Sequence, residues 1–397
     1  MMVNSPAQRS LPLFAVFEET AVKNDGMAET NLLSLSYGRI VPKSIDTVGG
    51  LLPASFETYQ IVNPGQIVLR LTDMQNDQKS LRSGLVQERG IITSAYCALQ
   101  SRGWGEGWNR YFDYFFHALD VSKQLYSLGG GVRQSLKYAD IKHVRVLIPS
   151  ESARDQIVRY LDVETAKIDH LIAKQRKLES LLDERELPMR EALFGCYVGT
   201  GERLKWHLSE TTTRLGSVDP GEHPLLSVSI HWGVRPRAET IGEASTADRF
   251  DHYKTVDVGD IIVNRMRAFQ GALGSSTFTG FTSPDYAVFK PDGEIDPSWL
   301  MQVMKTQSFV GEMTNRLTGI GGTEGGKVRT PRINSDDLLN IRIDIPSQSR
   351  QRANVSEFQT QIQEITKLKE STERMITLLQ ERRSALITAA VTGQIEV

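Results

Sequence analysis

The chain contains one sequence pattern twice, and this duplication constrains its fold more than any other feature. Leu32–Ser36 recurs as Leu225–Ser229, 193 residues later. Asp140–Ser150 recurs as Asp337–Ser347, at an offset of 197. Because the matched positions stay in order and keep their apolar character, we expect two copies of one structural unit that differ by short loop insertions.

Within each copy, short apolar runs alternate with amphipathic stretches. Runs that are rich in β-branched residues after a turn, or that alternate and stop at a proline, predict strands. The expected strands are Gln66–Leu71, Val144–Ile148, Asp260–Met266 and Ile341–Ile345, and the expected helices are Tyr111–Ala118 and Pro297–Lys305. Each copy is therefore expected to form an α/β or α+β domain.

A long helical segment follows each of these domains. Residues 151–193 contain no glycine and one proline, and residues 348–392 contain neither. Apolar residues recur at intervals of seven along both segments, as in a coiled coil. The expected helix-pairing residues are Leu161, Ile168, Leu171, Leu178 and Leu182 in the first segment, and Phe358, Ile365, Leu368, Met375 and Leu379 in the second.

A single apolar stripe usually packs on its own domain, but two matched stripes of this length are better buried against each other. We therefore expect an antiparallel coiled coil in which the polar Gln175 and Thr372 fix the register. The expected organisation is two globular domains, residues 1–150 and 196–347, each followed by a helical spacer, residues 151–195 and 348–397.

Charge and composition limit the function classes. The net charge is −2, so any DNA-binding surface must be a local patch or be completed by a partner. Cys97 and Cys196 are the only cysteines, which argues against a disulfide framework and for a reducing compartment. The apolar run Leu11–Phe17 lacks the features of a secretory signal, and no stretch is long enough to span a membrane. We expect a cytoplasmic protein.

Motifs for catalysis and cofactor binding are missing from the sequence. Gly321–Lys327 has the spacing of a phosphate-binding loop, but Val328 stands where a magnesium-binding hydroxyl is required. The histidines are scattered, without metal-ligand spacing to Cys or to one another. We expect no catalytic residue, no bound metal and no bound cofactor in this chain.

Five segments resemble type I restriction-modification specificity (S) subunits. Leu378–Ile395 is similar to the distal repeat of that family, and the Ile-Pro-Ser junctions at residues 148–150 and 345–347 resemble its joints between domain and helix. Leu204–Leu208 resembles the opening of a target recognition domain, and Gly325–Arg329 resembles a glycine-rich loop late in such domains.

The resemblance implies a non-catalytic subunit with two target recognition domains. Each domain would recognise one half of a bipartite target in double-stranded DNA. The helices would set the distance between the halves and dock two modification subunits, which methylate adenine with S-adenosylmethionine. Restriction subunits that use ATP and Mg²⁺ would join them in the full complex, and no membrane would be involved.

DNA bases are recognised by side chains with paired donors and acceptors on loops that enter a groove. Two loops in each copy have this composition. The candidates in the first copy are Arg102, Trp104, Trp108, Asn109, Arg110, Arg133, Gln134 and Lys137. The candidates in the second copy are Arg235, Arg237, Arg265, Arg267, Gln270, Thr323, Lys327, Arg329, Thr330 and Arg332.

Two other function classes are compatible with parts of this pattern. The first is a protein-binding scaffold, with two domains on a coiled-coil strut. The second is a self-contained modification enzyme, against which the absence of methyltransferase motifs argues. A titration of DNA binding against salt separates a DNA-binding subunit from a scaffold, because only the former has an affinity that falls steeply as salt rises.

Overall fold

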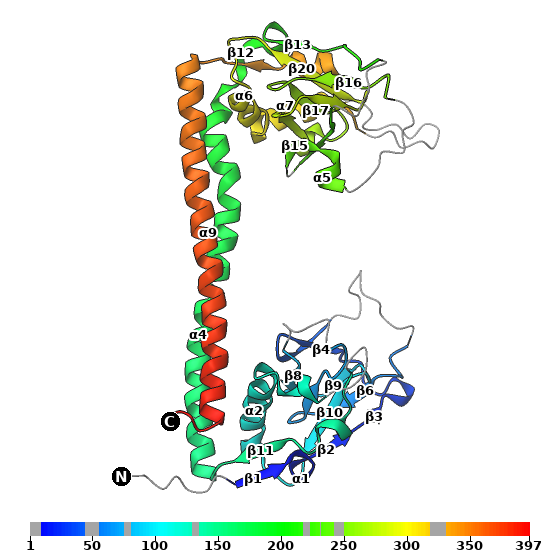
Figure 1. Cartoon of the computed structure of the whole chain (residues 1–397), viewed down its shortest axis with the longest axis vertical. Helices are drawn as coiled ribbons and strands as arrows, with labels where there is room; N and C mark the ends of the chain where they lie inside the picture. Colours follow the sequence, from blue (N-terminus) through cyan, green and yellow to red (C-terminus); the bar gives the residue numbers. More distant parts are fainter. Residues whose placement is uncertain are drawn as a thin grey trace. The chain divides into compact units, whose positions relative to one another are not determined.

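The computed structural model describes residues 9–43, 55–74, 81–128, 135–216, 223–230, 232–241, 250–317 and 331–397. The chain divides into two compact units. Unit 1 comprises Met1–Arg176 and Glu373–Val397, and unit 2 comprises Lys177–Thr372. Each unit contains one α/β domain and part of each of two 44-residue helices, α4 (Glu151–Phe194) and α9 (Gln348–Val391) (Figure 1).

Unit 1 contains eleven of the described strands. They are β1 (Arg9–Pro12), β2 (Phe17–Thr20), β3 (Val22–Lys23), β4 (Leu33–Ser36), β5 (Arg39–Pro42), β6 (Gln60–Val62), β7 (Ile67–Leu69), β8 (Ser83–Leu85), β9 (Gly90–Ile92), β10 (Cys97–Ser101) and β11 (Arg145–Ile148). The helices of its domain are α1 (Leu13–Val16), η1 (Asp25–Met27), η2 (Glu106–Trp108), α2 (Asn109–Val121), η3 (Gln124–Ser127) and α3 (Tyr138–Ile141).

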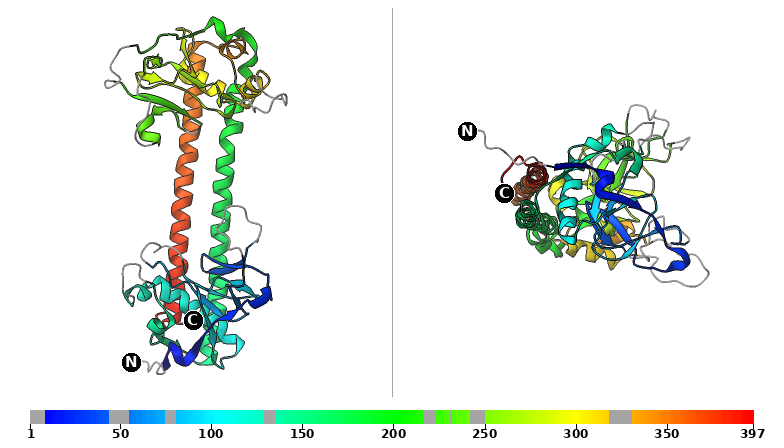
Figure 2. Two further views of the ribbon diagram at one scale, coloured as in Figure 1. Left: turned by 90° about the vertical axis from the view of Figure 1, so that its right-hand side faces the viewer. Right: turned by 90° about the horizontal axis from the view of Figure 1, so that it is seen from below.

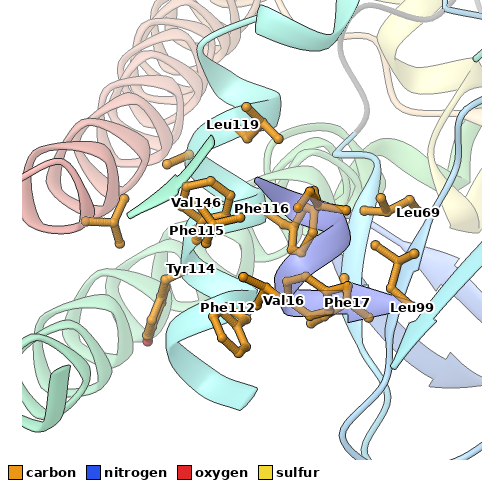
Figure 3. Close-up of a cluster of buried hydrophobic side chains, with 14 of the residues drawn as sticks. Val16, Phe17, Leu69, Leu99, Phe112, Tyr114, Phe115, Phe116, Leu119 and Val146 are labelled. Carbon is orange, nitrogen blue, oxygen red and sulfur yellow. The ribbon is translucent and has the colours of Figure 1, made fainter. Parts of the chain in front are cut away.

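The core of the unit 1 domain lies between α2 and the sheet with strand order β2-β10-β7-β8. Helix α2 buries aromatic residues along almost its whole length, including Phe112, Tyr114, Phe115 and Phe116. Figure 3 shows Phe112 and Phe116 beside Phe17 of the sheet, whereas Tyr114 lies on the side of α4. Burying such a side chain contributes about 1.5–3 kcal/mol, so α2 is fixed firmly on the sheet.

Unit 2 contains the other ten described strands. They are β12 (Val198–Arg203), β13 (Leu208–Glu210), β14 (Leu225–Ser229), β15 (Gly233–Pro236), β16 (Lys254–Val256), β17 (Ile261–Asn264), β18 (Leu273–Ser275), β19 (Gly280–Thr282), β20 (Tyr286–Pro291) and β21 (Arg342–Ile343). The helices of its domain are η4 (Gly195–Tyr197), η5 (Leu204–Trp206), α5 (Arg237–Ile241), η7 (Ala268–Gln270), α6 (Pro297–Met304), α7 (Gln307–Thr314) and α8 (Ser335–Leu339).

The predicted duplication is confirmed by the sheets. The order β13-β20-β17-β18 in unit 2 repeats β2-β10-β7-β8 in unit 1, and the antiparallel pair β12-β21 repeats β1-β11. The strands and helices expected from the sequence are present, although the strands are shorter at their ends. Helix α6 begins at Pro297 because the Asp296 carboxylate accepts hydrogen bonds from the backbone N–H groups of Ser298 and Trp299.

The helices α4 and α9 pack antiparallel within each unit, as the sequence predicts. In unit 1, Ile168 and Ile172 of α4 form a buried cluster with Leu379 of α9, and Leu161 lies in one core with Ile387. In unit 2, Leu182 and Met189 share a core with Phe358 and Ile365. Figure 2 shows the two helices side by side from two further directions. None of the described helices is long and apolar enough to cross a membrane.

One of the two predicted rows of helix-pairing residues is wrong. Leu171 and Leu178 are 46% and 40% exposed, and Leu368 and Met375 are 52% and 46% exposed. The inward-facing row lies one residue further along each helix and contains the buried Thr165 and Ile172 and the partly buried Ile376. Steps of three and four residues fit either row, and the predicted row was chosen on its apolar Leu171, Leu178, Leu368 and Met375, whose residue types do not show which way they face.

Candidate nucleic-acid interface

The first predicted DNA-binding loop is largely structural, which corrects the sequence prediction for Trp108. The Trp108 side chain is 5% exposed and stacks on Phe112, with 5.6 Å between ring centroids. The Arg154 guanidinium lies 4.8 Å from the centroid of the Trp108 ring. Trp104 packs edge-on against Trp108 at 4.7 Å. Trp108 is therefore a core residue of unit 1 and is not free to contact a base.

Arg110 is also misassigned by the sequence prediction. Its Nε donates to Asp162 of α4 at 2.9 Å, and its Nη1 donates to Asp113 at 2.7 Å. The guanidinium also lies 4.6 Å from the centroid of the Tyr114 ring. These contacts engage both edges of the Arg110 guanidinium group. Arg110 therefore attaches α2 to α4 and has no free edge for guanine.

The remaining DNA-binding candidates of unit 1 differ in their exposure and in their contacts. Arg102 is half-exposed, donates to the Phe17 carbonyl at 3.3 Å and pairs with Glu18 at 3.2 Å. The Asn109 side chain lies against Gly65, where an added Cβ would be 2.7 Å from Asn109 Nδ2. Lys137 is exposed at the start of α3. Arg133 and Gln134 lie outside the described residues, so their assignment stays a prediction.

Unit 2 brings several predicted residues together at the start of β20. Arg265 follows β17, and its Nε donates to the Asp285 carbonyl at 3.0 Å. Arg332 Nη2 lies 3.8 Å from Asp285 Oδ1, and the Ile333 N–H donates to the Arg265 carbonyl at 3.1 Å. The pKa of Arg265 is lowered by burial and by the nearby positive charge of Arg332. Two arginines thus converge on one aspartate.

Tyr286 extends this group toward the hairpin β14–β15. Its pKa is raised by burial, and the positive charges of Arg237 and Arg267 oppose that increase. We call Arg237, Arg265, Arg267 and Arg332, gathered around Asp285 and Tyr286, the arginine cluster. Four arginines near Asp285, with Glu210 also acting on Arg265, provide the donor-rich local patch that phosphate and guanine contacts require.

Other predicted residues flank the arginine cluster. Gln270 is exposed at the end of η7, directly before Gly271. Arg235 is half-exposed on β15 and forms a 3.9 Å ion pair with Glu239. Thr323, Lys327, Arg329 and Thr330 lie outside the described residues, as does the phosphate-loop-like segment Gly321–Lys327, and they remain predictions.

The sequence prediction missed Asp285 and Tyr286, which organise the cluster. The register of β17 with β20 places Asn264 opposite Tyr286, so Arg265 emerges beside Asp285. That register is not visible in either segment alone. The only sequence signal is the polar turn Thr282–Asp285 directly before an apolar strand.

Among the described residues, one group has the composition of a metal site, at His207, Asp292 and Glu294. His207 Nδ1 lies 2.8 Å from Asp292 Oδ2, and Nε2 lies 3.1 Å from Glu202 Oε2. Burial lowers the pKa of His207, but the hydrogen bonds to Glu202 and Asp292 raise it overall. Both ring nitrogens are therefore engaged by carboxylates, and the group is an ion-paired clamp between β12 and the end of β20.

No protein-family model matches the chain, and no curated protein matches its sequence. Solved structures do match it over almost its whole length. One is a chain from the type I R-M system, described in work on complex assembly and conformational transition. It has a TM-score of 0.63 and 16% identity, and the match covers 98% of this chain and 99% of that chain.

The HsdS subunit of Thermoanaerobacter tengcongensis also matches, with a TM-score of 0.54 and 17% identity, over 98% of each chain. The fold is therefore that of a type I restriction-modification system chain. More specifically, it is the fold of an S (HsdS) subunit, which confirms the fold expected from the sequence resemblance.

Proposed function

We propose that this chain is the non-catalytic DNA-specificity subunit of a type I restriction-modification complex. Each α/β domain recognises one half of a bipartite target, and the helices α4 and α9 set the separation of the halves and dock two modification subunits. The observation that carries this proposal is the duplicated sheet on paired long helices, in the fold of an S subunit. S-adenosylmethionine, ATP and Mg²⁺ belong to the partner subunits in this proposal.

The arginine cluster supports DNA recognition by unit 2. The net charge of the whole chain is −2, so a patch of four arginines around one aspartate is a local exception. Arginine forks can donate two hydrogen bonds to guanine, and Asp285 holds Arg265 and Arg332 near a fixed orientation. In unit 1 the corresponding role falls to Arg133, Gln134 and Lys137.

The exposed row of the helices supports docking of partner subunits. In unit 1, Asp162 and Asp169 of α4 pair with Arg110 and Arg39 of the domain, so the domain covers that flank of α4. Leu171 lies one residue before the buried Ile172, and Met375 lies one residue before Ile376. Equivalent flanking positions of two antiparallel helices lie on the same side, so Leu171 and Met375 form one apolar strip.

Unit 2 carries the equivalent strip. Leu178 and Leu368 flank the seam there, and the duplication relates Leu368 to Leu171 and Met375 to Leu178 at the offset of 197. One strip in each unit provides two equivalent docking sites, which agrees with two copies of a modification subunit. Exposed apolar strips of this kind typically mark contacts between proteins.

The test is binding of the purified chain to duplex DNA across a range of salt concentrations, with and without the modification subunits. The proposal predicts specific binding whose affinity falls steeply as salt rises. A chain that assembles with the modification subunits but shows no DNA binding in either state is a protein scaffold.

A further inference from the structure

Two equivalent β-hairpins project from the domains, one in each unit. In unit 1, β4 pairs with β5 so that Ser36 faces Arg39, and Tyr37 and Gly38 form the tip. In unit 2, β14 pairs with β15 so that Ser229 faces Gly233, and the tip includes Ile230 and Trp232. The strands β4 and β14 are the duplicated segments from which the repeat was detected.

Each hairpin is seated on a glycine of the neighbouring strand. A Cβ on Gly84 of β8 would lie 2.9 Å from Leu35 Cδ1 and 3.2 Å from Ile40 Cδ1. A Cβ on Gly274 of β18 would lie 2.9 Å from Val234 Cγ2. At Gly274 the added Cβ would also lie 3.0 Å from the Val234 backbone nitrogen, so a larger residue there would push on the backbone of the hairpin.

The tips expose large aromatic side chains that folding does not require. Tyr37 is 84% exposed and Trp232 is 66% exposed. Tyr37 has φ 48° and Gly38 has φ 75°, a turn in which Asn-Gly is the favourable pair. A bulky residue at positive φ is strained, and such strain is typical of functional positions. Neither burial nor favourable backbone geometry accounts for an aromatic residue at this tip.

The surroundings of Trp232 are cationic. A depression of about 360 Å³ lies beside its ring, lined by Trp232, Arg235, Phe278, Met301 and Lys305 among other residues, none of them acidic. The pKa of Lys305 is lowered by burial and by the charge of Arg190, and Glu186 offsets this only in part. Aromatic faces next to cations are the chemistry of nucleic-acid contacts, in which rings stack on bases and cations bind phosphates.

The hairpin tip of unit 2 also adjoins the residues after β17. A Cβ on Gly271 would lie 4.0 Å from Ile230 Cγ2, which places the tip beside η7 and the segment that carries Arg267. In unit 1, Tyr37 lines a cavity of about 310 Å³ whose charged residues include three arginines together with Asp113 and Asp169. Those arginines pair with the two aspartates, so the cationic surroundings belong to the tip of unit 2, and Tyr37 corresponds to Trp232 through the equivalence of the hairpins.

We propose that Tyr37 and Trp232 are equivalent DNA-contacting residues, one for each half of the target. Each aromatic ring packs against a base or sugar of its half-site, and Arg235 and Lys305 bind backbone phosphate beside Trp232. This inference rests on the proposed function, and it identifies a part of the DNA interface that lies outside the arginine cluster. Duplex DNA is favoured over a protein partner because the depression beside Trp232 joins cations to the aromatic ring without acidic residues.

The test uses the full chain assembled with the modification subunits and a duplex that carries its methylation target. Tyr37→Ala and Trp232→Ala are each expected to weaken binding roughly tenfold, the order of effect of no longer burying one aromatic side chain against the duplex. Trp232→Phe should restore most of the affinity. Trp206→Ala is the matched control, because Trp206 is 68% exposed in the same unit but lies outside the hairpin.

The outcomes separate this inference from the proposed function. If the wild-type assembly binds no duplex, the proposed function fails and the inference fails with it. If wild type binds but Tyr37→Ala and Trp232→Ala bind equally well, only the inference is overturned. A third outcome is that Tyr37→Ala or Trp232→Ala impairs assembly with the modification subunits while the assembled fraction keeps its DNA affinity. That result would show that the tips contact protein, and it would also overturn the inference.

Discussion

Asp169 of α4 and Arg383 of α9 form a 3.0 Å ion pair within unit 1, although 214 residues separate them in the sequence. The Asp169 carboxylate also accepts from Arg39 of β5 at 2.8 Å. The first domain is thus completed by the C-terminal part of the chain, which contributes Ile387, Ala390 and Val391 to its core.

Removal of residues 373–397 should therefore destabilise unit 1 and leave unit 2 folded. The deletion uncovers Leu161, Ile168 and Ile172, and each buried side chain of this size contributes about 1.5–3 kcal/mol. Hydrogen exchange measured by mass spectrometry should show loss of protection in α2 and β10 but not in β17 and β20. Equal protection of all four elements would contradict this division of the chain.

Arg267→Ala should weaken binding of the cognate duplex by about 1–3 kcal/mol if Arg267 contacts a base. Recognition should relax only in the half-site of unit 2, because the arginine cluster belongs to that unit. Arg350→Ala, an exposed arginine of α9 in the same unit, is the control. Equal effects of the two substitutions would indicate a general charge effect rather than base recognition.

Leu171→Asp combined with Leu368→Asp should abolish assembly with the modification subunits without unfolding the chain. Both side chains are about half exposed, so a charge there costs the folded chain little but is costly in a buried interface between subunits. Analytical ultracentrifugation of the mixture measures assembly. Val163→Asp is the matched control, at a position 54% exposed on another side of α4. Normal assembly of the double variant would show that the strips do not dock the partners.

The duplicated fold could be predicted from the sequence because each element repeats. Leu32–Ser36 and Leu225–Ser229 became β4 and β14 at nearly the same bounds. Helices α4 and α9 were also expected, since glycine and proline are almost absent from them. Local patterns with two independent copies allow the element types to be assigned with few alternatives.

The candidate site was harder to predict, because residue type does not reveal what a side chain contacts. Trp108 and Arg110 have the composition of a DNA-binding loop, but Phe112 and Asp162 engage them. The arginine cluster depends on Asp285, which reaches Arg265 only through the pairing of β17 with β20. Long-range pairing of this kind cannot be seen from residue types alone.

Stability should depend on pH through His117 of α2. Burial and then the charge of Arg383 lower its pKa from 6.5 to about 4, and its Nε2 has no hydrogen-bond partner among the residues that the structure describes. The unfolded chain takes up a proton near pH 6.5 and the folded chain only near pH 4. The stabilisation is therefore complete above pH 6.5 and is lost as the pH falls toward 4.

His117→Asn should remove this loss of stability at low pH. Between pH 6.5 and 4, wild type should therefore lose up to about 3 kcal/mol of unfolding free energy relative to the variant. Asp113 affects stability in the opposite direction, because burial raises its pKa to about 6. The stability that protonated Asp113 contributes is lost as the pH rises from about 4 to 6. Asp113 is present in both proteins, so the comparison isolates His117. Urea denaturation measures the unfolding free energy of both proteins. If it changes equally with pH in wild type and in His117→Asn between pH 6.5 and 4, the prediction is contradicted.

Inserting four residues after Arg176 and four after Arg374 should widen the gap between the half-sites. Each insertion adds about 6 Å of helix at ~1.5 Å per residue, and DNA rises by ~3.4 Å per base pair. The gap should grow by one or two base pairs while both half-sites stay the same. An unchanged gap, or altered half-sites, would show that α4 and α9 do not measure the DNA.

The most direct test of DNA specificity is to map methylated adenines in cells that express this chain together with its modification subunits. We expect one bipartite motif, with two short half-sites separated by a fixed number of unspecified base pairs. Arg267→Ala should change only one of these half-sites. A motif without a gap, or a methylation pattern that is the same when this chain is absent, would contradict the account.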